Sequence, residues 1–314
     1  MRARLTAALL VGLLGWAVLA SAQTPAARKD LALRGDAQCT RCHGEDEEFP
    51  VLAIGKTRHG VKADLRTPTC TSCHGESDRH VNRPADAKER PKPDRMFTKN
   101  AKTSMEDRSG ACLTCHQGGK RIHWQMGPHA SRDVSCTSCH QVHTPHDAVR
   151  DKRAQPDVCF ACHKEQRAQL NRPSRHPIRE GKVACSDCHN PHGTAGEKLL
   201  VRDTVNDTCY SCHMEKRGPF VRTHQPVQEN CAICHNPHGS VNENLLKWRA
   251  PFLCQQCHEP TSHRGNMGSF TGPANTPGGS TSANFLARGC LNCHTNIHGT
   301  NNPSNISNER TFRR

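Results

Sequence analysis

The sequence has few of the residues that normally build a hydrophobic core. Of its 314 residues, 34% are hydrophobic and 4% are aromatic, and Tyr210 is its single tyrosine. A cofactor-free chain of this composition would be weakly folded or disordered, because it cannot bury enough apolar surface to offset the entropy lost on folding. No segment alternates apolar and polar residues for long, so we expect almost no β-sheet.

Long hydrophobic runs are also missing, except at the very start of the chain. A basic beginning and an apolar run to Leu19 precede the sequence Ala20-Ser-Ala22, which has the small residues of a cleavage site. We therefore predict a signal peptide at residues 1–22 and an exported mature chain at 23–314. The run is short for a bilayer span and no later run is long enough, which disfavours a retained anchor.

Cysteines are missing outside one repeated motif, although the chain has 20 of them. All belong to ten Cys-x-x-Cys-His units, which argues against a disulfide framework even though disulfides would suit an exported protein. Zinc ribbons also use Cys-x-x-Cys pairs, but they do not need the histidine that follows every pair here. On one helical turn, residues i, i+3 and i+4 project from one face, so two thiols and an imidazole can converge on one planar ligand.

This geometry predicts ten covalently bound c-type haems, each attached by two thioethers, with the motif histidine binding the iron. The predicted attachment residues are Cys39, Cys42, Cys70, Cys73, Cys112, Cys115, Cys136, Cys139, Cys159, Cys162, Cys185, Cys188, Cys209, Cys212, Cys231, Cys234, Cys254, Cys257, Cys290 and Cys293. The predicted motif ligands are His43, His74, His116, His140, His163, His189, His213, His235, His258 and His294. The haems would then supply the core that the side chains cannot.

Twelve further histidines could occupy the other side of the irons. The ten that recur with the motifs, and that we predict as distal ligands, are His59, His80, His129, His143, His176, His192, His224, His238, His263 and His298. His123 and His146 are left over, each as an alternative to a close neighbour. No methionine recurs with the motifs, which favours histidine at every site.

The histidine count separates an electron carrier from an enzyme. An iron held by two histidines has no open position and mainly exchanges electrons, whereas an open position allows a small ligand to bind and react. Multihaem enzymes commonly mark their reactive haem with a lysine in place of the motif histidine or with a tyrosine cross-link. All ten motifs end in histidine, and we expect Tyr210 to pack against the seventh haem. We therefore predict an electron carrier with no catalytic residues.

The motifs and histidines group into five two-haem repeats, an internal period typical of a repetitive architecture. The predicted repeats span about 39–80, 112–146, 159–192, 209–238 and 254–298, with a charged, proline-containing loop at 82–110, a Gly/Ser/Thr-rich loop at 265–289 and a polar tail at 300–314. Short helices are expected at 164–170 and 107–118. Asn-Pro-His-Gly, at 190–193 and 236–239, should end a helix and turn its histidine away from the haem of its own motif.

The charge balance is strongly basic, at +14 for the whole chain and +12 without Arg2 and Arg4. Such a balance could indicate nucleic-acid binding, but the export signal and the scarcity of aromatics argue against it. Ten ferric haems with ionised propionates would bring the holoprotein to about +2. We therefore expect Lys and Arg to neutralise propionates or to face solvent.

Ten motifs, two Cys-x-x-Cys-His-Asn-Pro-His-Gly segments and a signal peptide together resemble the periplasmic decahaem cytochromes of the MtrA/MtoA/PioA/DmsE family. The resemblance implies an elongated multihaem cytochrome c, mostly coil with short α-helices wrapped around a chain of ten haems. It also implies a place within an outer-membrane β-barrel porin. There the protein would carry electrons between periplasmic or inner-membrane cytochromes and extracellular iron or another external donor or acceptor, with or without an extracellular multihaem cytochrome. The alternative is a diffusible periplasmic shuttle that feeds a terminal reductase.

Overall fold

The computed structural model describes residues 35–45, 47, 50–98, 100–258, 290–292 and 294–302. The predicted signal peptide, His263, Cys293, the loop at 265–289 and the tail beyond residue 302 lie outside the described residues. The α-helices are α1 (Ala37–Thr40), α2 (Cys70–His74), α3 (Asp78–Val81), α4 (Met105–Leu113), α5 (Gln155–Phe160), α6 (Lys164–Gln169), α7 (Cys185–Cys188), α8 (Val205–Tyr210), α9 (Gln225–Glu229) and α10 (Phe252–Gln255). The 3-10 helices are η1 (Val51–Lys56), η2 (Arg58–Gly60), η3 (Gly119–Arg121), η4 (Ala130–Arg132), η5 (Cys136–Ser138), η6 (Ala148–Arg150), η7 (Glu197–Leu199), η8 (Met214–Lys216), η9 (Cys231–Ile233), η10 (Glu243–Leu245) and η13 (Cys290–Asn292).

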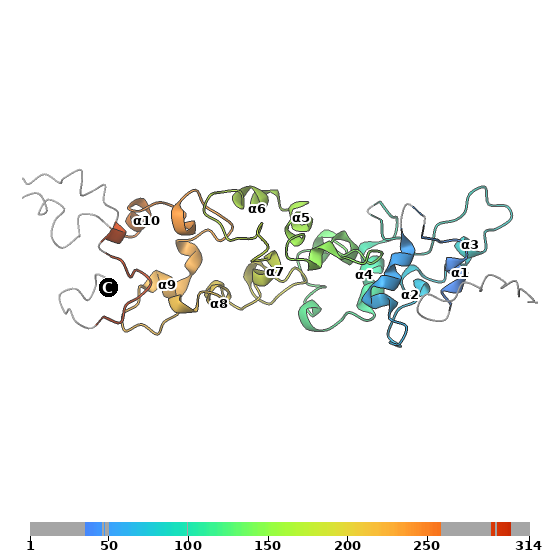
Figure 1. Ribbon diagram of the computed structural model, residues 1–314, viewed down its shortest axis with the longest axis horizontal. Helices are drawn as coiled ribbons and strands as arrows, with labels where there is room; N and C mark the ends of the chain where they lie inside the picture. The colour runs from blue at the N-terminus through green and yellow to red at the C-terminus, as the bar shows by residue number, and fades with distance from the viewer. Residues whose placement is uncertain are drawn as a thin grey trace, which may run out of the picture.

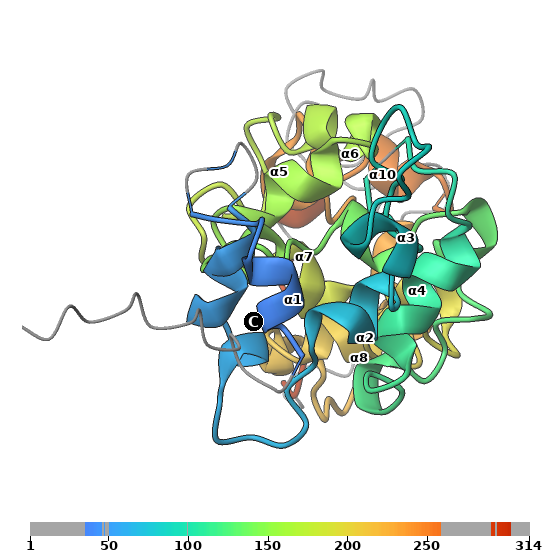
Figure 2. The same ribbon diagram turned by 90° about the vertical axis from the view of Figure 1, so that its right-hand side faces the viewer.

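The molecule is elongated, and the chain runs along it from α1 near one end to α10 near the other (Figure 1). Viewed along the long axis, the helices are distributed around a rounded outline (Figure 2). The described part of the chain has no strand, and its β-type pairing is limited to isolated bridges such as Ser174 with Ser240. The expected fold, mostly coil with short helices and elongated, is confirmed. Within the described ranges, no helix is long and apolar enough to cross a membrane.

The hydrophobic core is small, as the composition predicts. Seven hydrophobic residues of the described chain are buried, and the main cluster consists of Phe160, Leu170 and Ile178 with Val183 packed against it. This cluster lies at the fifth motif, where α5 and α6 pack together. A domain of this size normally relies on a far larger apolar core, so most of the chain is held by turns, caps and polar contacts.

The ten motifs begin their helical turns in two alternating ways. In odd-numbered motifs the first cysteine lies at or near the end of a helix that began earlier, as Cys112 does in α4. In most even-numbered motifs the first cysteine starts the turn. A polar side chain directly before it caps the turn, as Thr69 does for α2 by accepting from the backbone N–H of Ser72. Since such caps satisfy N–H groups that have no partner inside the helix, they fix where these very short turns begin.

One of the two expected helices is confirmed, whereas the bounds of the other helix and of the loop expected at 82–110 need adjustment. The helix expected at 164–170 is confirmed as α6, whereas the one expected at 107–118 begins at Met105 and ends at Leu113. The predicted loop at 82–110 is therefore wrong over its last residues, which belong to α4. The rest of that loop packs against the second motif, because the carbonyl of Arg95 accepts from the His74 ring and Asp94 accepts from the Ser77 N–H.

Candidate haem-binding sites

Each described motif forms one α-helical turn. The backbone N–H of the motif histidine donates to the carbonyl of the first cysteine at 2.9–3.1 Å in nine motifs, and the second motif forms the whole of α2. This turn brings the two thiols and the imidazole to one side, as the i, i+3, i+4 spacing predicts. Asn-Pro-His-Gly does follow the end of such a turn, since α7 ends at Cys188 and Pro191 lies in a separate turn.

Nine motif histidines each face one histidine from the predicted distal set. Their ring centres are 5.9–6.2 Å apart. The pairs, motif histidine first, are His43–His80, His74–His143, His116–His59, His140–His192, His163–His129, His189–His238, His213–His176, His235–His298 and His258–His224. The structure thus brings together every predicted distal histidine that it describes.

The spacing fits two imidazoles on opposite sides of one metal ion. With metal–nitrogen distances of about 2.0 Å and ring radii near 1.15 Å, the ring centres would lie about 6.3 Å apart. The angle between ring planes runs from 9° to 86° while the spacing stays constant. Two rings that share one metal axis can rotate freely about it, whereas rings packed directly on each other change their separation between stacked and edge-on arrangements. The nine sites therefore fit axial histidine ligands of a haem iron.

The histidine pairs cross between repeats according to a simple rule. Each odd-numbered motif faces the histidine that lies between the two motifs of the preceding repeat, as His213 faces His176. Each even-numbered motif faces the histidine that closes the following repeat, as His189 faces His238. The first motif has no preceding repeat and faces His80 of its own. Eight of the nine pairs therefore join two repeats, so no repeat is a self-contained unit.

The other ring nitrogen of many of these histidines is held by an acceptor. In seven rings Nδ1 lies 2.8–2.9 Å from a backbone carbonyl oxygen, as between His176 and Pro237 or His129 and Pro191. Donation from Nδ1–H fixes the tautomer and leaves Nε2 free to bind a metal, the usual arrangement around metal-binding histidines. Both acceptor prolines belong to Asn-Pro-His-Gly. A motif that continues into this sequence therefore contributes to three sites: its own, the one whose motif histidine faces the added histidine, and the one whose distal ring is oriented by the proline carbonyl.

Burial favours the neutral form of several distal rings. It lowers the pKa of His59, His238 and His298, and burial, followed by the nearby side chains of His140 and Arg121, lowers the pKa of His192 to about 4. Neutral imidazole is the form that binds a metal, because protonation occupies the lone pair. At neutral pH these four side chains are therefore ready to act as ligands.

Cysteine side chains of consecutive motifs lie near one another. Within each pair of motifs the two first cysteines interact directly: Cys39 with Cys70, Cys112 with Cys136, Cys159 with Cys185, Cys209 with Cys231 and Cys254 with Cys290. Between pairs, the second cysteine of an even-numbered motif lies within electrostatic range of a cysteine of the next motif: Cys73 of Cys115, Cys139 of Cys162, Cys188 of Cys209 and Cys234 of Cys257. The described motifs thus form an unbroken series along the molecule.

Sequence reasoning missed a set of buried polar residues that join the two motifs of a pair. Asp36 and Asn206 precede the first cysteine of an odd-numbered motif by three residues, and Gln155 precedes it by four. Each accepts the backbone N–H at the start of the next motif: Cys70 to Asp36 at 2.9 Å, Ser186 to Gln155 at 2.9 Å and Cys231 to Asn206 at 2.7 Å. We call them the joining residues. The sequence signal that could have found them is an Asp, Asn or Gln three or four residues before the first cysteine of the first, fifth and seventh motifs.

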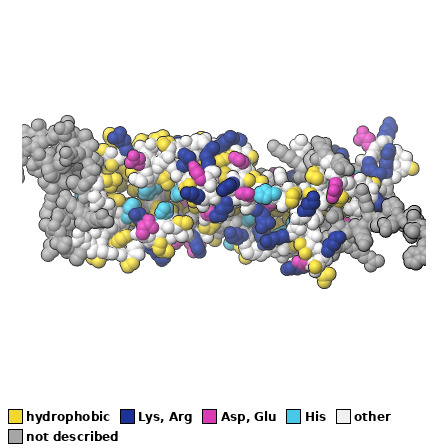
Figure 3. Space-filling model, in the orientation of Figure 1, with side chains coloured by type: hydrophobic (Ala, Val, Ile, Leu, Met, Phe, Trp, Pro, Cys, Tyr) yellow, Lys and Arg dark blue, Asp and Glu magenta, His cyan; other side chains and the backbone are white. Residues whose placement is uncertain are grey.

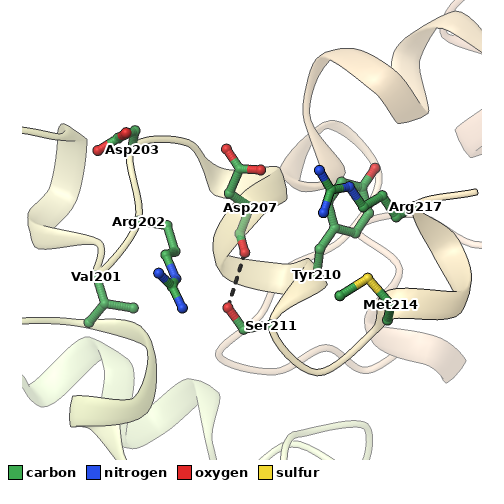
Figure 4. A pocket seen from close by; sticks show the side chains of 8 residues that line it. All are labelled: Val201, Arg202, Asp203, Asp207, Tyr210, Ser211, Met214 and Arg217. Carbon is green, nitrogen blue, oxygen red and sulfur yellow. Dashed lines mark hydrogen bonds between the residues drawn. The ribbon is translucent and has the colours of Figure 1, made fainter.

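The two leftover histidines and the single tyrosine have other surroundings. His146 is exposed and bonds to Asp151 at 3.1 Å, and the histidine pairs of the described chain include neither His146 nor His123. Tyr210 lines an open groove of about 400 Å³ with Arg202, Arg217 and Met214 (Figure 4). Two guanidinium groups in one groove could neutralise carboxylates such as haem propionates. Lys and Arg also gather over the middle of the face in Figure 3, interspersed with acidic side chains.

Comparison with known proteins agrees with this geometry. The doubled CXXCH motif family matches residues 176–218 and 224–263, and the cytochrome c-type protein NrfB-like family matches residues 70–155. The multiheme cytochrome MtrA of Shewanella baltica is 41% identical over 285 residues, which cover 86% of this chain and 80% of that protein. The chain belongs to the MtrA family of multihaem cytochromes. The cytochrome c-type protein NrfB of Haemophilus influenzae is 29% identical over 147 residues, 41% of this chain and 64% of that protein.

Membership in this family makes the protein a multihaem c-type cytochrome that transfers electrons, with several haems attached through its Cys-x-x-Cys-His motifs. Each doubled-motif match spans an even-numbered motif and the odd-numbered motif after it, one motif out of phase with the predicted repeats. The two groupings are compatible, because cysteines of consecutive motifs lie near one another both within and between the predicted repeats.

Proposed function

We propose that the chain carries ten haems, each held by two cysteines and by two axial histidines. The nine histidine pairs support this assignment for the first nine motifs. For the tenth motif the pairing rule leaves His263, of the last repeat, as the partner of His294. We also propose that the five repeats predicted from sequence are the units of this series.

A haem supplies an iron that changes between the ferric and ferrous states by one electron. The chain's histidines would occupy both axial positions and leave none for a substrate. Its backbone carbonyls would fix the ring orientations, so that little rearrangement accompanies each change of charge. This favours a pure electron carrier over an enzyme.

We propose further that the protein conducts electrons across the outer membrane inside a β-barrel porin. The observation that carries this proposal is the unbroken series of motifs along an elongated molecule (Figure 1), since a conductor needs sites from end to end. A barrel is proposed because the surface is rich in charged side chains (Figure 3) and exposed loop backbone is too costly to place in lipid. Periplasmic or inner-membrane cytochromes would exchange electrons at one end, and extracellular iron or another external donor or acceptor at the other. A diffusible periplasmic shuttle remains the competing function.

Cell fractionation separates the two functions. The conduit proposal expects the cytochrome in detergent-solubilised outer membranes, co-purifying with a barrel protein. Recovery only in the soluble periplasm, with no barrel protein attached, would favour the shuttle. The mass of the purified holoprotein tests the haem count independently, and fewer than ten haems per mature chain would refute the decahaem proposal.

A further inference from the structure

The motif histidine of the fourth site has an acceptor unlike those of the second, sixth and eighth sites. His140 Nδ1 lies 2.7 Å from the carboxylate oxygen Oδ2 of Asp147. In the second, sixth and eighth motifs the corresponding nitrogen donates to a backbone carbonyl, as from His74 to Arg95 and from His189 to Lys198. The fourth site therefore has a full negative charge where these sites have a peptide dipole.

Asp147 is held firmly in place. Its side chain is 17% exposed, its other carboxylate oxygen accepts the backbone N–H of Gln141 at 3.3 Å, and its backbone carbonyl accepts from Arg150 where η6 begins. The comparable contact at the first motif, from His43 to Glu47, is longer at 3.1 Å, and its carboxylate is 37% exposed. At the seventh motif Glu215 lies 3.8 Å from the ring nitrogen of His213, too far for a hydrogen bond.

A carboxylate in this position changes the electronic balance of a metal site. By accepting the Nδ1 proton it makes the imidazole a more basic ligand, and its charge attracts the more positive, oxidised metal. Shielding from water strengthens this attraction. Both effects stabilise the ferric over the ferrous state, which lowers the reduction potential.

We propose that Asp147 is a positioning residue that lowers the reduction potential of the fourth haem below those of the second and sixth. The inference rests on the axial ligation proposed above, but it does not depend on a barrel partner. The fourth haem would then accept an electron less readily than the second haem, which precedes it in the series, and the sixth, which follows it. Electron flow in either direction must then pass a step at this point.

The first test is spectroelectrochemical titration of the holoprotein with Asp147→Asn, which keeps an acceptor of the same size and removes the charge. We expect one haem to shift by at least tenfold in its ferric/ferrous equilibrium constant, equivalent to about 59 mV upward for a one-electron couple. Asp151→Asn is the matched control, because it removes a nearby charge whose carboxylate accepts from the leftover His146 and from the backbone N–H of Arg153, and the ring bonded to it is not a motif histidine. No shift in the Asp147 variant, or an equal shift in both, would overturn the inference.

A second test does not depend on the folding of that variant. Methionine in place of an axial histidine raises the potential of its own haem, so His143→Met, His192→Met and His238→Met each identify one midpoint in the titration. In the titration of the wild-type protein, the midpoint that His192→Met shifts should lie below the midpoints that His143→Met and His238→Met shift. If this wild-type midpoint lies above either of the other two, the inference fails while the conduit proposal stands. High-spin ferric sites in the wild-type protein would instead refute the ligation on which both rest.

Discussion

Removing the joining residue Asn206 tests whether the two motifs of a pair depend on one buried side chain. Asn206 is 7% exposed, accepts the N–H of Cys231 at 2.7 Å and donates to the carbonyls of Val227 and Gln228 at 2.9 and 3.0 Å. Asn206→Ala leaves all three backbone partners without this side chain. At 0.5–1.5 kcal/mol for each hydrogen bond, the fourth pair should lose about 2–4 kcal/mol of local stability.

Guanidinium unfolding of the holoprotein, followed by visible absorption and circular dichroism, measures this loss. Each repeat interacts mainly with its neighbours in the series. We therefore expect the seventh and eighth motifs of the variant to unfold first, in a separate phase at lower guanidinium concentration, rather than the whole transition to shift as one. Asn206→Asp keeps the acceptor for Cys231 and should lose less. The exposed Asn171→Ala is the matched control. If Asn206→Ala unfolds at the midpoint of this control, the joining residues do not hold the pairs together.

Three further predictions concern the histidines and the turns that position them. His238→Ala should convert one low-spin haem, that of the sixth motif, to a high-spin form that binds added imidazole, with all ten haems still attached; the exposed His146→Ala should change nothing, and an unchanged low-spin spectrum in His238→Ala would contradict the assignment. Gly239 has φ +143°, and a Cβ there would overlap the carbonyl of Gln169, so Gly239→Ala should cost about 1–3 kcal/mol in thermal unfolding. Gly44→Ala, which meets open space, should cost far less, and equal costs would refute the close approach. Because the orientation of axial rings tunes the iron, electron paramagnetic resonance should resolve a more anisotropic class of low-spin signal from the two pairs whose planes lie at 84° and 86°, and a single uniform class would contradict the ring geometry.

Much of the site could be predicted because covalent attachment requires a contiguous motif. The helical turn of each Cys-x-x-Cys-His follows from local spacing alone. The choice of distal histidines rested on their recurrence with the motifs, and the structure sets His129 and His143, rather than His123 and His146, opposite motif histidines. The sparse hydrophobic composition likewise indicated a chain with little core of its own.

The pairing of histidines could not be predicted, because it depends on how repeats pack rather than on distance along the chain. His238 is three residues from His235 yet faces His189, which lies in another repeat. The segment 231–239 contributes to three sites, since Pro237 also orients His176. Asp147 and the joining residues were missed for a similar reason: their acceptor roles follow from burial and from contacts that a single sequence does not reveal.

Transmembrane electron transfer in reconstituted vesicles tests the central claim most directly. Vesicles would contain the co-purified barrel protein with the cytochrome, the barrel protein alone, or the cytochrome alone, each enclosing a reduced dye that cannot cross the membrane. A soluble ferric chelate outside would serve as the acceptor. The conduit predicts rapid oxidation of the dye only when both proteins are present. Oxidation no faster than with the barrel protein alone would contradict it.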